Sequence, residues 1–253
     1  MKDILKVEGK KALITGGTSG IGRATALLFL EFGIDVAANY SKNDEKAKSL
    51  VEEAKGKKGR LITVKGDVSD YETVRRIVEE VIKEFGTIDF LVHSAGIPTP
   101  QPDTPENWDK VMRVHLYSCY NLEKFVVPVM KEKRSGKIVI VSSLCAHSTG
   151  KNAYSCSMAG KICFAKGLAK ELAPFNINVN TVSPGTIFTP MLEYIPEEER
   201  IKMTKENIPL YRNKEGYPKG EEVASVILFL VSDLSRHITG QDIIVDGGQF
   251  IHY

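Results

Sequence analysis

Long apolar runs are missing from this sequence of 253 residues, and no segment approaches the roughly 20 apolar residues that span a bilayer. A strong charge of either sign is also missing, because 34 Lys and Arg residues are balanced by 32 Asp and Glu residues. The basic residues form no cluster of the kind that binds nucleic acid. The first residues lack the charged, apolar and small-residue order of a secretion signal. We therefore expect a cytoplasmic protein that binds neither membranes nor nucleic acid.

Cysteine is scarce and is not arranged for metal binding. The four cysteines, Cys119, Cys145, Cys156 and Cys163, show no CxxC spacing and stand near no group of other metal ligands. We expect them to be reduced thiols in the core, and we expect no metal site. Repeats, low-complexity tracts and linkers are missing too, so residues 1–253 are predicted to form a single domain.

What the sequence does contain is an alternation of short apolar segments with longer amphipathic ones. The short segments are rich in Val and Ile and apolar on both faces, which is typical of strands covered by helices on both sides. Seven strands are predicted, at Ala12–Thr15, Val36–Asn39, Leu61–Val64, Phe90–His93, Lys137–Ser142, Asn178–Val182 and Asp242–Val245. Strict alternation with helices predicts an α/β fold with a doubly wound, seven-stranded parallel sheet.

One long segment, Thr189–Lys219, fits neither pattern and reads as irregular. In a compact domain a segment of this kind is usually functional. We expect residues 189–219 to form a substrate-binding lid.

A glycine-rich turn, TGGTSGIG at residues 15–22, lies between the first predicted strand and the first predicted helix. Glycines there let the backbone turn tightly and approach a pyrophosphate at the helix N-terminus. The spacing of Gly16, Gly20 and Gly22 is GxxxGxG, which differs from the GxGxxG of the general dinucleotide-binding turn. It resembles the turn of the short-chain dehydrogenase/reductase family, whose members are Rossmann-fold oxidoreductases that use NAD(H) or NADP(H).

The resemblance extends along nearly the whole chain, with six motifs in family order. GDVSD (66–70) resembles the segment that holds the adenine, and HSAG (93–96) stands where the family usually has NNAG beside the ribose. SPGTIFTPM (183–191) resembles the stretch that contacts the nicotinamide, and IIVDGG (243–248) resembles the C-terminal strand. The resemblance implies a cofactor site formed by Gly16, Thr18, Ser19, Gly20, Ile21, Gly22, Asp67, Val68, Ser94, Ala95, Gly96, Pro184, Gly185, Ile187 and Thr189.

The end of the second predicted strand bears on the choice between NAD(H) and NADP(H). An acidic residue there would bind the ribose 2′-hydroxyl and repel a 2′-phosphate. The position is held by Tyr40, followed by Ser41 and Lys42, and no carboxylate stands there. Hydroxyls and a cation favour NADP(H) over NAD(H), although Lys42 also fits an ordinary solvated loop lysine.

The catalytic positions of the family are matched only in part. In the family a tyrosine acts as the acid or base, a serine hydrogen-bonds the same substrate oxygen, and a lysine four residues after the tyrosine lowers the tyrosine pKa. Tyr154 matches the tyrosine and Ser143 the serine, with Ser142 as the alternative. Met158 stands where the lysine is expected, and His115 stands where the family has an asparagine that completes a water relay.

Lys161 is the candidate replacement for the missing lysine. It follows Tyr154 by about two helical turns, so both side chains are expected on one helix face, roughly 10 Å apart along the axis. A similar separation of tyrosine and lysine resembles the divergent enoyl carrier-protein reductases of this superfamily. Lys161 also fits an ordinary surface lysine, and His115 fits either a proton relay or a satisfied core histidine.

The motifs and length are most similar to the 3-oxoacyl carrier-protein reductase branch of the family. This implies an NADP(H)-dependent enzyme that moves a hydride between the nicotinamide and the carbonyl or alcohol of a small molecule or acyl thioester. An enoyl-thioester reductase and a catalytically impaired nucleotide-binding protein remain alternatives. Because its two long helices carry more apolar residues than one stripe, we also expect a homotetramer.

Overall fold

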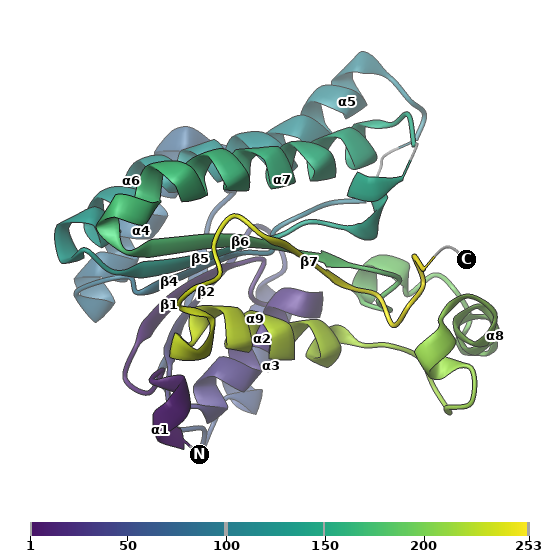
Figure 1. The fold of residues 1–253 in the computed structure, drawn as a ribbon, viewed down its shortest axis with the longest axis horizontal. Helices are drawn as coiled ribbons and strands as arrows, with labels where there is room; N and C mark the ends of the chain where they lie inside the picture. The colour runs from purple at the N-terminus through teal and green to yellow at the C-terminus, as the bar shows by residue number, and fades with distance from the viewer. Residues whose placement is uncertain (1, 99–100, 149, 252–253) are drawn as a thin grey trace.

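Seven parallel strands form one sheet between two layers of helices (Figure 1). The computed structural model describes residues 2–98, 101–148 and 150–251. The strands follow the order β3-β2-β1-β4-β5-β6-β7 across the sheet. Their bounds are β1 Lys11–Thr15, β2 Asp35–Tyr40, β3 Leu61–Lys65, β4 Phe90–His93, β5 Gly136–Val141, β6 Ile177–Pro184 and β7 Asp242–Val245. The predicted fold class is confirmed, and each strand begins and ends within about two residues of its predicted bounds.

The helices separate into the two layers that a doubly wound sheet requires. One face carries α4 (Tyr71–Phe85), α5 (Pro105–Met112), α6 (Ser118–Lys133) and α7 (Ala153–Leu172), and the other carries α1 (Lys2–Leu5), α2 (Gly20–Glu31), α3 (Asp44–Glu53) and α9 (Gly220–Val231) (Figure 1). Each layer has its own buried cluster against the sheet, the first with Val74 and Leu122 and the second with Phe29 and Ile227. Apolar side chains on both faces of the strands therefore hold both layers.

Helix α4 shows how the sequence sets the helix ends. The Asp70 side chain accepts a hydrogen bond from the backbone N–H of Thr73, which caps the first turn. Gly86, the residue after the helix, has a φ of 77°, a left-handed conformation that suits glycine. Val74, Ile77, Val78 and Val81 face the sheet and are buried, as their helical spacing predicts.

The strand order reverses between β1 and β4, and this position locates the site. From β1 the chain proceeds to β2 on one side, whereas β4 lies on the other side. The loops that follow these two strands therefore separate, which leaves a crevice at the carboxyl edge of the sheet. The glycine-rich turn follows β1 and HSAG includes the end of β4, so both border this crevice.

The helical segment that carries His115 contains a change in winding. Between α5 and α6, residues Arg113–Tyr117 form a π-helical turn. Such turns are rare and frequently mark functional sites. His115 lies in this turn, and its side chain is fully buried.

Two expectations about surface segments need correction. Residues 189–219 are not irregular throughout, because α8 (Glu197–Asn207) forms where Pro196 is followed by three glutamates that suit a helix N-terminus. Of the four cysteines only Cys119 is buried, since Cys156 and Cys163 lie on the outer face of α7. Among the described residues, no helix combines the length and apolar character needed to cross a bilayer.

Candidate active site

A cavity of about 610 Å³ lies at the carboxyl edge of the sheet. Its walls come from the glycine-rich turn, the segments after β4, β5 and β6, the first turns of α7 and the chain after β7. It brings together most of the predicted site residues: Gly16, Ser19, Gly20, Ile21, Ser94, Ala95, Gly96, His115, Ser143, Tyr154, Lys161, Pro184, Gly185, Ile187 and Thr189. The predicted residues that do not line it are Thr18, Gly22, Tyr40, Ser41, Lys42, Asp67 and Val68.

The glycine-rich turn has the shape needed to hold an anion. Gly16 and Gly20 have φ values of 65° and 52°, and a Cβ atom on Gly22 would lie 2.3 Å from the carbonyl oxygen of Gly16. Helix α2 begins at this turn, and the side chain of its N-cap residue, Ser19, makes no capping hydrogen bond. The first amides of the helix are therefore left for a ligand, and a pyrophosphate fits them.

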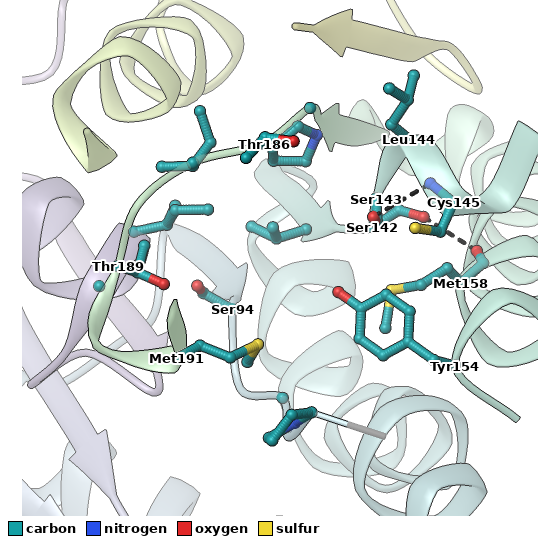
Figure 2. Close-up of a pocket in the computed structure, with 18 of the residues that line it drawn as sticks. Ser94, Ser142, Ser143, Leu144, Cys145, Tyr154, Met158, Thr186, Thr189 and Met191 are labelled. Carbon is teal, nitrogen blue, oxygen red and sulfur yellow. Dashed lines mark hydrogen bonds between the residues drawn. The ribbon is translucent and has the colours of Figure 1, made fainter. Parts of the chain in front are cut away.

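Ser143 and Tyr154 face each other across the cavity, and Figure 2 shows the Tyr154 hydroxyl pointing into it. Ser143 is the second residue after β5, and its Oγ accepts a hydrogen bond of 3.2 Å from the backbone N–H of Cys145. Burial raises the pKa of Tyr154 above its ordinary value, and the nearby Ser143 hydroxyl offsets part of that rise. Ser142 points elsewhere, because its Oγ donates to the Met158 carbonyl oxygen at 3.0 Å. The geometry thus favours Ser143 over Ser142.

Lys161 is buried at the base of the cavity and is not a surface lysine. Its side chain is 1% exposed, and its Nζ donates a hydrogen bond of 3.0 Å to the carbonyl oxygen of Val141, at the end of β5. Within the described part of the chain this is the one acceptor found for an ammonium that has three N–H donors. Burial lowers the pKa of Lys161. Met158, which lies one turn nearer Tyr154, presents its thioether to the same cavity (Figure 2).

His115 is held by hydrogen bonds at both ring nitrogens. Its Nε2 accepts from the backbone N–H of Ile97 at 2.9 Å, so Nδ1 carries the proton and donates to the Oγ of Ser157 at 2.9 Å. Burial, followed by the nearby Lys161, lowers the pKa of His115 to about 3. Its ring packs edge-on against Tyr154, with centroids 5.4 Å apart. This arrangement favours the satisfied, neutral histidine over the proton relay that the sequence left open.

His93, at the end of β4, carries its proton on Nε2, whereas His115 carries its proton on Nδ1. The Thr15 hydroxyl accepts from the Ala95 amide and donates to His93 Nδ1 at 2.7 Å. The Nε2–H then donates to Ser118 Oγ at 2.8 Å, and Ser118 in turn donates to the Val114 carbonyl oxygen. This chain joins β1 and β4 to the π-helical turn, and it holds the segment after β4 in place.

Several wall residues were not found by sequence reasoning. Leu144 and Cys145 contribute an apolar and a sulfur-containing side chain, and Gln249 and Phe250 close the wall from the chain after β7. Gln249 accepts from the Thr186 amide at 2.8 Å, which links the C-terminal segment to the loop after β6. Nothing in the sequence pattern signals these contacts, because they depend on how distant loops meet.

The region beyond the cavity, where an adenosine would extend, also differs in detail from expectation. The Tyr40 hydroxyl donates to Asp44 at 2.9 Å, so it is already engaged, and Lys42 is exposed. A second cation, Lys46, donates from Nζ to the Ser19 Oγ at 3.3 Å, which places it beside the glycine-rich turn. Sequence reasoning missed Lys46 because its position depends on how α3 packs beside α2.

Known proteins resemble this chain in both sequence and fold. A family model described as "Enoyl-(Acyl carrier protein) reductase" matches residues 16–249. The chain is similar to the 3-oxoacyl-[acyl-carrier-protein] reductase FabG of Thermotoga maritima, with 44% identity over 253 residues that cover 98% of this chain and 100% of the relative. The same-named protein of Staphylococcus aureus is 36% identical over 247 residues, which cover 96% of this chain and 98% of the relative.

Solved structures of dehydrogenases and reductases resemble this chain in fold. Levodione reductase superposes with a TM-score of 0.87 and 29% identity, covering 98% of this chain and 100% of its own. A dehydrogenase/reductase from Sinorhizobium meliloti superposes with a TM-score of 0.88 and 28% identity over 99% of both chains. Similarity over nearly the full length, together with the site geometry, shows that the chain belongs to the short-chain dehydrogenase/reductase family and is one of its oxidoreductases.

Proposed function

We propose that this protein reduces the ketone of a 3-oxoacyl thioester, presented by an acyl carrier protein, with NADPH as the hydride source. The observation that carries the proposal is the meeting of Ser143 and Tyr154 over a cavity that is bordered by the glycine-rich turn. Relatives at 44% and 36% identity are named as reductases of this substrate class, which supports the same choice here.

The cavity wall supports a neutral, largely apolar substrate. Leu144, Ile187, Met191 and Phe250 supply apolar surface, whereas Lys161 is the one lysine, arginine or carboxylate among the described lining residues. A free carboxylate or phosphate on the substrate would meet no exposed cation there, and its desolvation would go uncompensated. A thioester has no charge near its ketone, so it fits this wall.

The residues around the substrate carbonyl would each have a different role in the reaction. When bound, the reduced nicotinamide supplies the hydride to the carbonyl carbon. Tyr154 donates its phenolic proton to the carbonyl oxygen as negative charge develops there, and Ser143 donates a hydrogen bond to the same oxygen. The apolar wall excludes water from the reacting atoms.

We further propose that Lys161 supplies a cation to the ribose of the cofactor, in place of the lysine that Met158 replaces. A buried ammonium with a single acceptor is costly, and it retains N–H donors for the ribose hydroxyls of a cofactor or for a bridging water. Its position at the base of the cavity allows it to act from below the ribose rather than from beside Tyr154. Met158 then contributes only apolar surface.

The choice of NADP(H) is also a proposal, and two lysines support it, one bonded to the glycine-rich turn and one shortly after the end of β2. Lys46 stands next to Ser19, and Lys42 lies exposed at the start of the α3 segment. We expect NADPH to bind more tightly than NADH by about 1–2 kcal/mol, a factor of roughly 5–30. Titration of both cofactors by intrinsic fluorescence tests this, and Tyr40→Asp should reverse the preference by repelling the phosphate. Equal dissociation constants in the parent protein would remove the basis for NADP(H).

An enoyl-thioester reductase is the second candidate. Two observations favour it: the separation of Tyr154 and Lys161 in the sequence, and the match to a family described as enoyl-(acyl carrier protein) reductase. A nucleotide-binding protein with impaired catalysis is the third, and the methionine at position 158 favours that reading.

One assay separates the three candidates. The purified protein is incubated with NADPH and either a 3-oxoacyl or a 2-enoyl thioester, and the loss of NADPH absorbance is followed. We expect turnover of the 3-oxoacyl thioester that is abolished in Tyr154→Phe. Turnover of the enoyl thioester alone would establish the second candidate, and no turnover of either, with NADPH still bound, would establish the third.

A further inference from the structure

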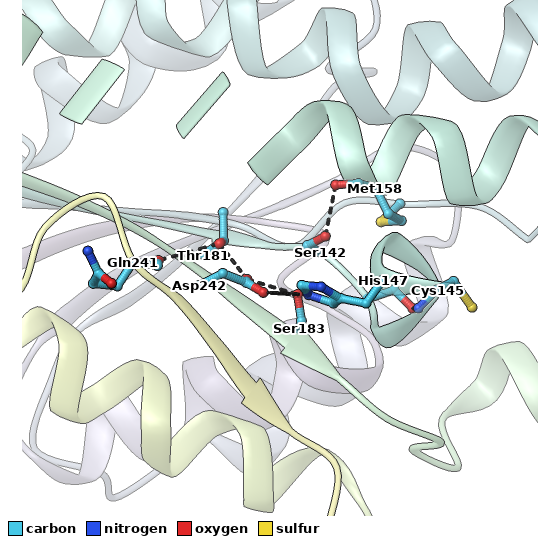
Figure 3. A network of polar contacts seen from close by, with 9 residues as sticks. Ser142, Cys145, His147, Met158, Thr181, Ser183, Gln241 and Asp242 are labelled. Atoms are coloured by element: carbon cyan, nitrogen blue, oxygen red, sulfur yellow. Dashed lines mark hydrogen bonds and ion pairs between the residues drawn. The ribbon is translucent and has the colours of Figure 1, made fainter. Parts of the chain in front are cut away.

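We propose that His147 and Asp242 form an anchor that holds the turn presenting Ser143, so that His147 is a positioning residue for the catalytic serine. The inference rests on the proposed function for its kinetic consequence, although the anchor itself is a structural feature. Figure 3 shows the imidazole of His147 reaching from this turn to the carboxylate of Asp242 on β7. The two residues are 95 positions apart in the sequence.

The turn itself is short and is tied together mainly by local bonds. Residues Leu144–His147 form a 3₁₀ turn whose N-cap is Ser143. The Ser143 Oγ accepts from the Cys145 amide, and the Ser148 hydroxyl donates to the Cys145 carbonyl oxygen. These bonds shape the turn, but they do not fix its direction relative to the sheet.

The bond between His147 Nε2 and Asp242 Oδ2, 2.8 Å long, supplies the long-range tie. A carboxylate only accepts hydrogen bonds, so Nε2 carries the proton. The His147 ring also lies 6.1 Å from the ring of Phe250, which lines the cavity. Among the described residues, the other hydrogen bonds found for the side chains of residues 143–148 are local, with partners at Cys145 and Gly150.

Asp242 is well suited to serve as the fixed end of the tie. Its side chain is only 10% exposed, and its oxygens also accept from the hydroxyls of Thr181 and Ser183 on β6. Three side-chain donors therefore orient one carboxylate, and two of them stand on β6, the strand that pairs with β7. A partner held in this way can hold His147, and through it the turn.

Loss of the anchor should act on Ser143 and only weakly on the cofactor. The turn would shift away from β7 and carry Ser143 with it, so the hydroxyl would leave its position facing Tyr154. In the described part of the chain, no hydrogen bond found joins the anchor to the glycine-rich turn or to the segment after β4, so NADPH binding should persist. His147→Ala should therefore lower kcat by about 10–100-fold, within the range of a lost positioning contact, and change the NADPH dissociation constant by less than about twofold.

The kinetic test places the substitution in two backgrounds. His147→Gln retains an amide N–H near the place of Nε2 and should recover most of the activity. In Ser143→Ala, where no serine remains to be positioned, His147→Ala should cause no further loss of kcat. An equal loss in both backgrounds would show that His147 acts elsewhere and would overturn the proposal. His237→Ala, the same change at an exposed histidine, is the matched control.

A second test needs no turnover, so it separates failure of the anchor from failure of the proposed function. Hydrogen exchange of the peptide that spans residues 143–148 is followed by mass spectrometry in the protein without ligand. His147→Ala and Asp242→Ala should each accelerate exchange at least tenfold, whereas His147→Gln and His237→Ala should not. Unchanged exchange in both alanine variants would overturn the anchor even if the enzyme reduces its thioester as proposed.

Discussion

Along one face of α7, a thioether stands at position 158, where the family has an ammonium, and an ammonium stands one turn later, at position 161. The side chain beside Tyr154 is apolar, and the cation lies deeper, bonded to the end of β5. A buried cation with one acceptor destabilises a fold unless something else requires it. Its presence therefore favours a ligand contact over a packing role, which the sequence alone left open.

Lys161→Met tests this argument because function and stability should change in opposite directions. Removal of the poorly paired ammonium should stabilise the protein without ligand, by on the order of 1–4 kcal/mol, with an unfolding midpoint that rises accordingly. The same change should lower kcat by about 10²-fold or more if Lys161 holds the ribose and supports Tyr154. Lys166→Met, at an exposed position of the same helix, should alter neither quantity. Thermal unfolding and NADPH oxidation provide the measurements.

Two further observations complete that test. Because burial lowers the pKa of Lys161, the unfolded chain binds more protons than the folded one between the folded pKa and about 10.4. The stability advantage of Lys161→Met should therefore shrink as the pH rises from 7 toward 10. Adding Met158→Lys to Lys161→Met restores the family spacing of tyrosine and lysine. The double variant should have a kcat at least tenfold above that of Lys161→Met. Full activity in Lys161→Met alone would end the idea of a relocated lysine.

The raised pKa of Tyr154 predicts different pH profiles for the two directions of reaction. Burial favours the neutral phenol, which is the proton donor for ketone reduction, so kcat for reduction should be nearly flat between pH 6 and 9. Alcohol oxidation needs the phenolate as base, and its kcat should rise about tenfold per pH unit through the same range. Steady-state rates with NADPH and NADP⁺ provide both profiles. An oxidation profile that levels off below pH 9 would mean that a cation acidifies Tyr154.

Among the elements, the glycine-rich turn makes the strongest steric demand. Gly22→Ala would place a Cβ atom 2.3 Å from the Gly16 carbonyl oxygen, so the turn must open. We expect the loss of measurable NADPH binding and destabilisation by more than about 2 kcal/mol. Gly167→Ala, in α7 with no atom near the added Cβ, should instead stabilise by about 0.5–1 kcal/mol. Calorimetric titration and urea unfolding measure the two effects, and tight NADPH binding by Gly22→Ala would contradict the assignment of the turn.

The sequence was most informative where one element determines its own structure. The strands were predicted because buried parallel strands are apolar on both faces. The π-helical turn at Arg113–Tyr117 was not predicted, because it depends on how His115 packs against Ile97 and Ser157. The burial of Lys161 and the anchor between His147 and Asp242 also depend on which distant segments meet, and a lysine or histidine in a local pattern carries no sign of that.

At the scale of the whole molecule, the outer faces of α6 and α7 bear on assembly. Tyr117 and Tyr120 are 54% and 47% exposed, and Cys156 and Cys163 are exposed on α7. We predict that these faces pack against their twofold mates in a homotetramer. Light scattering should give about four times the chain mass of 28.0 kDa, and Tyr120→Glu should shift the protein toward smaller species. A mass of one chain at micromolar concentration would contradict the prediction.

The cavity draws its walls from both halves of the sequence, since Gly16 and Phe250 border the same space. During synthesis on a ribosome, the nucleotide-binding turn emerges early, whereas β7 and the segment after it emerge more than 220 residues later. A nascent chain therefore cannot gain the stabilisation that a fully enclosed ligand provides. The central strands must hold together on their own apolar surface until those late residues leave the exit tunnel and close the wall.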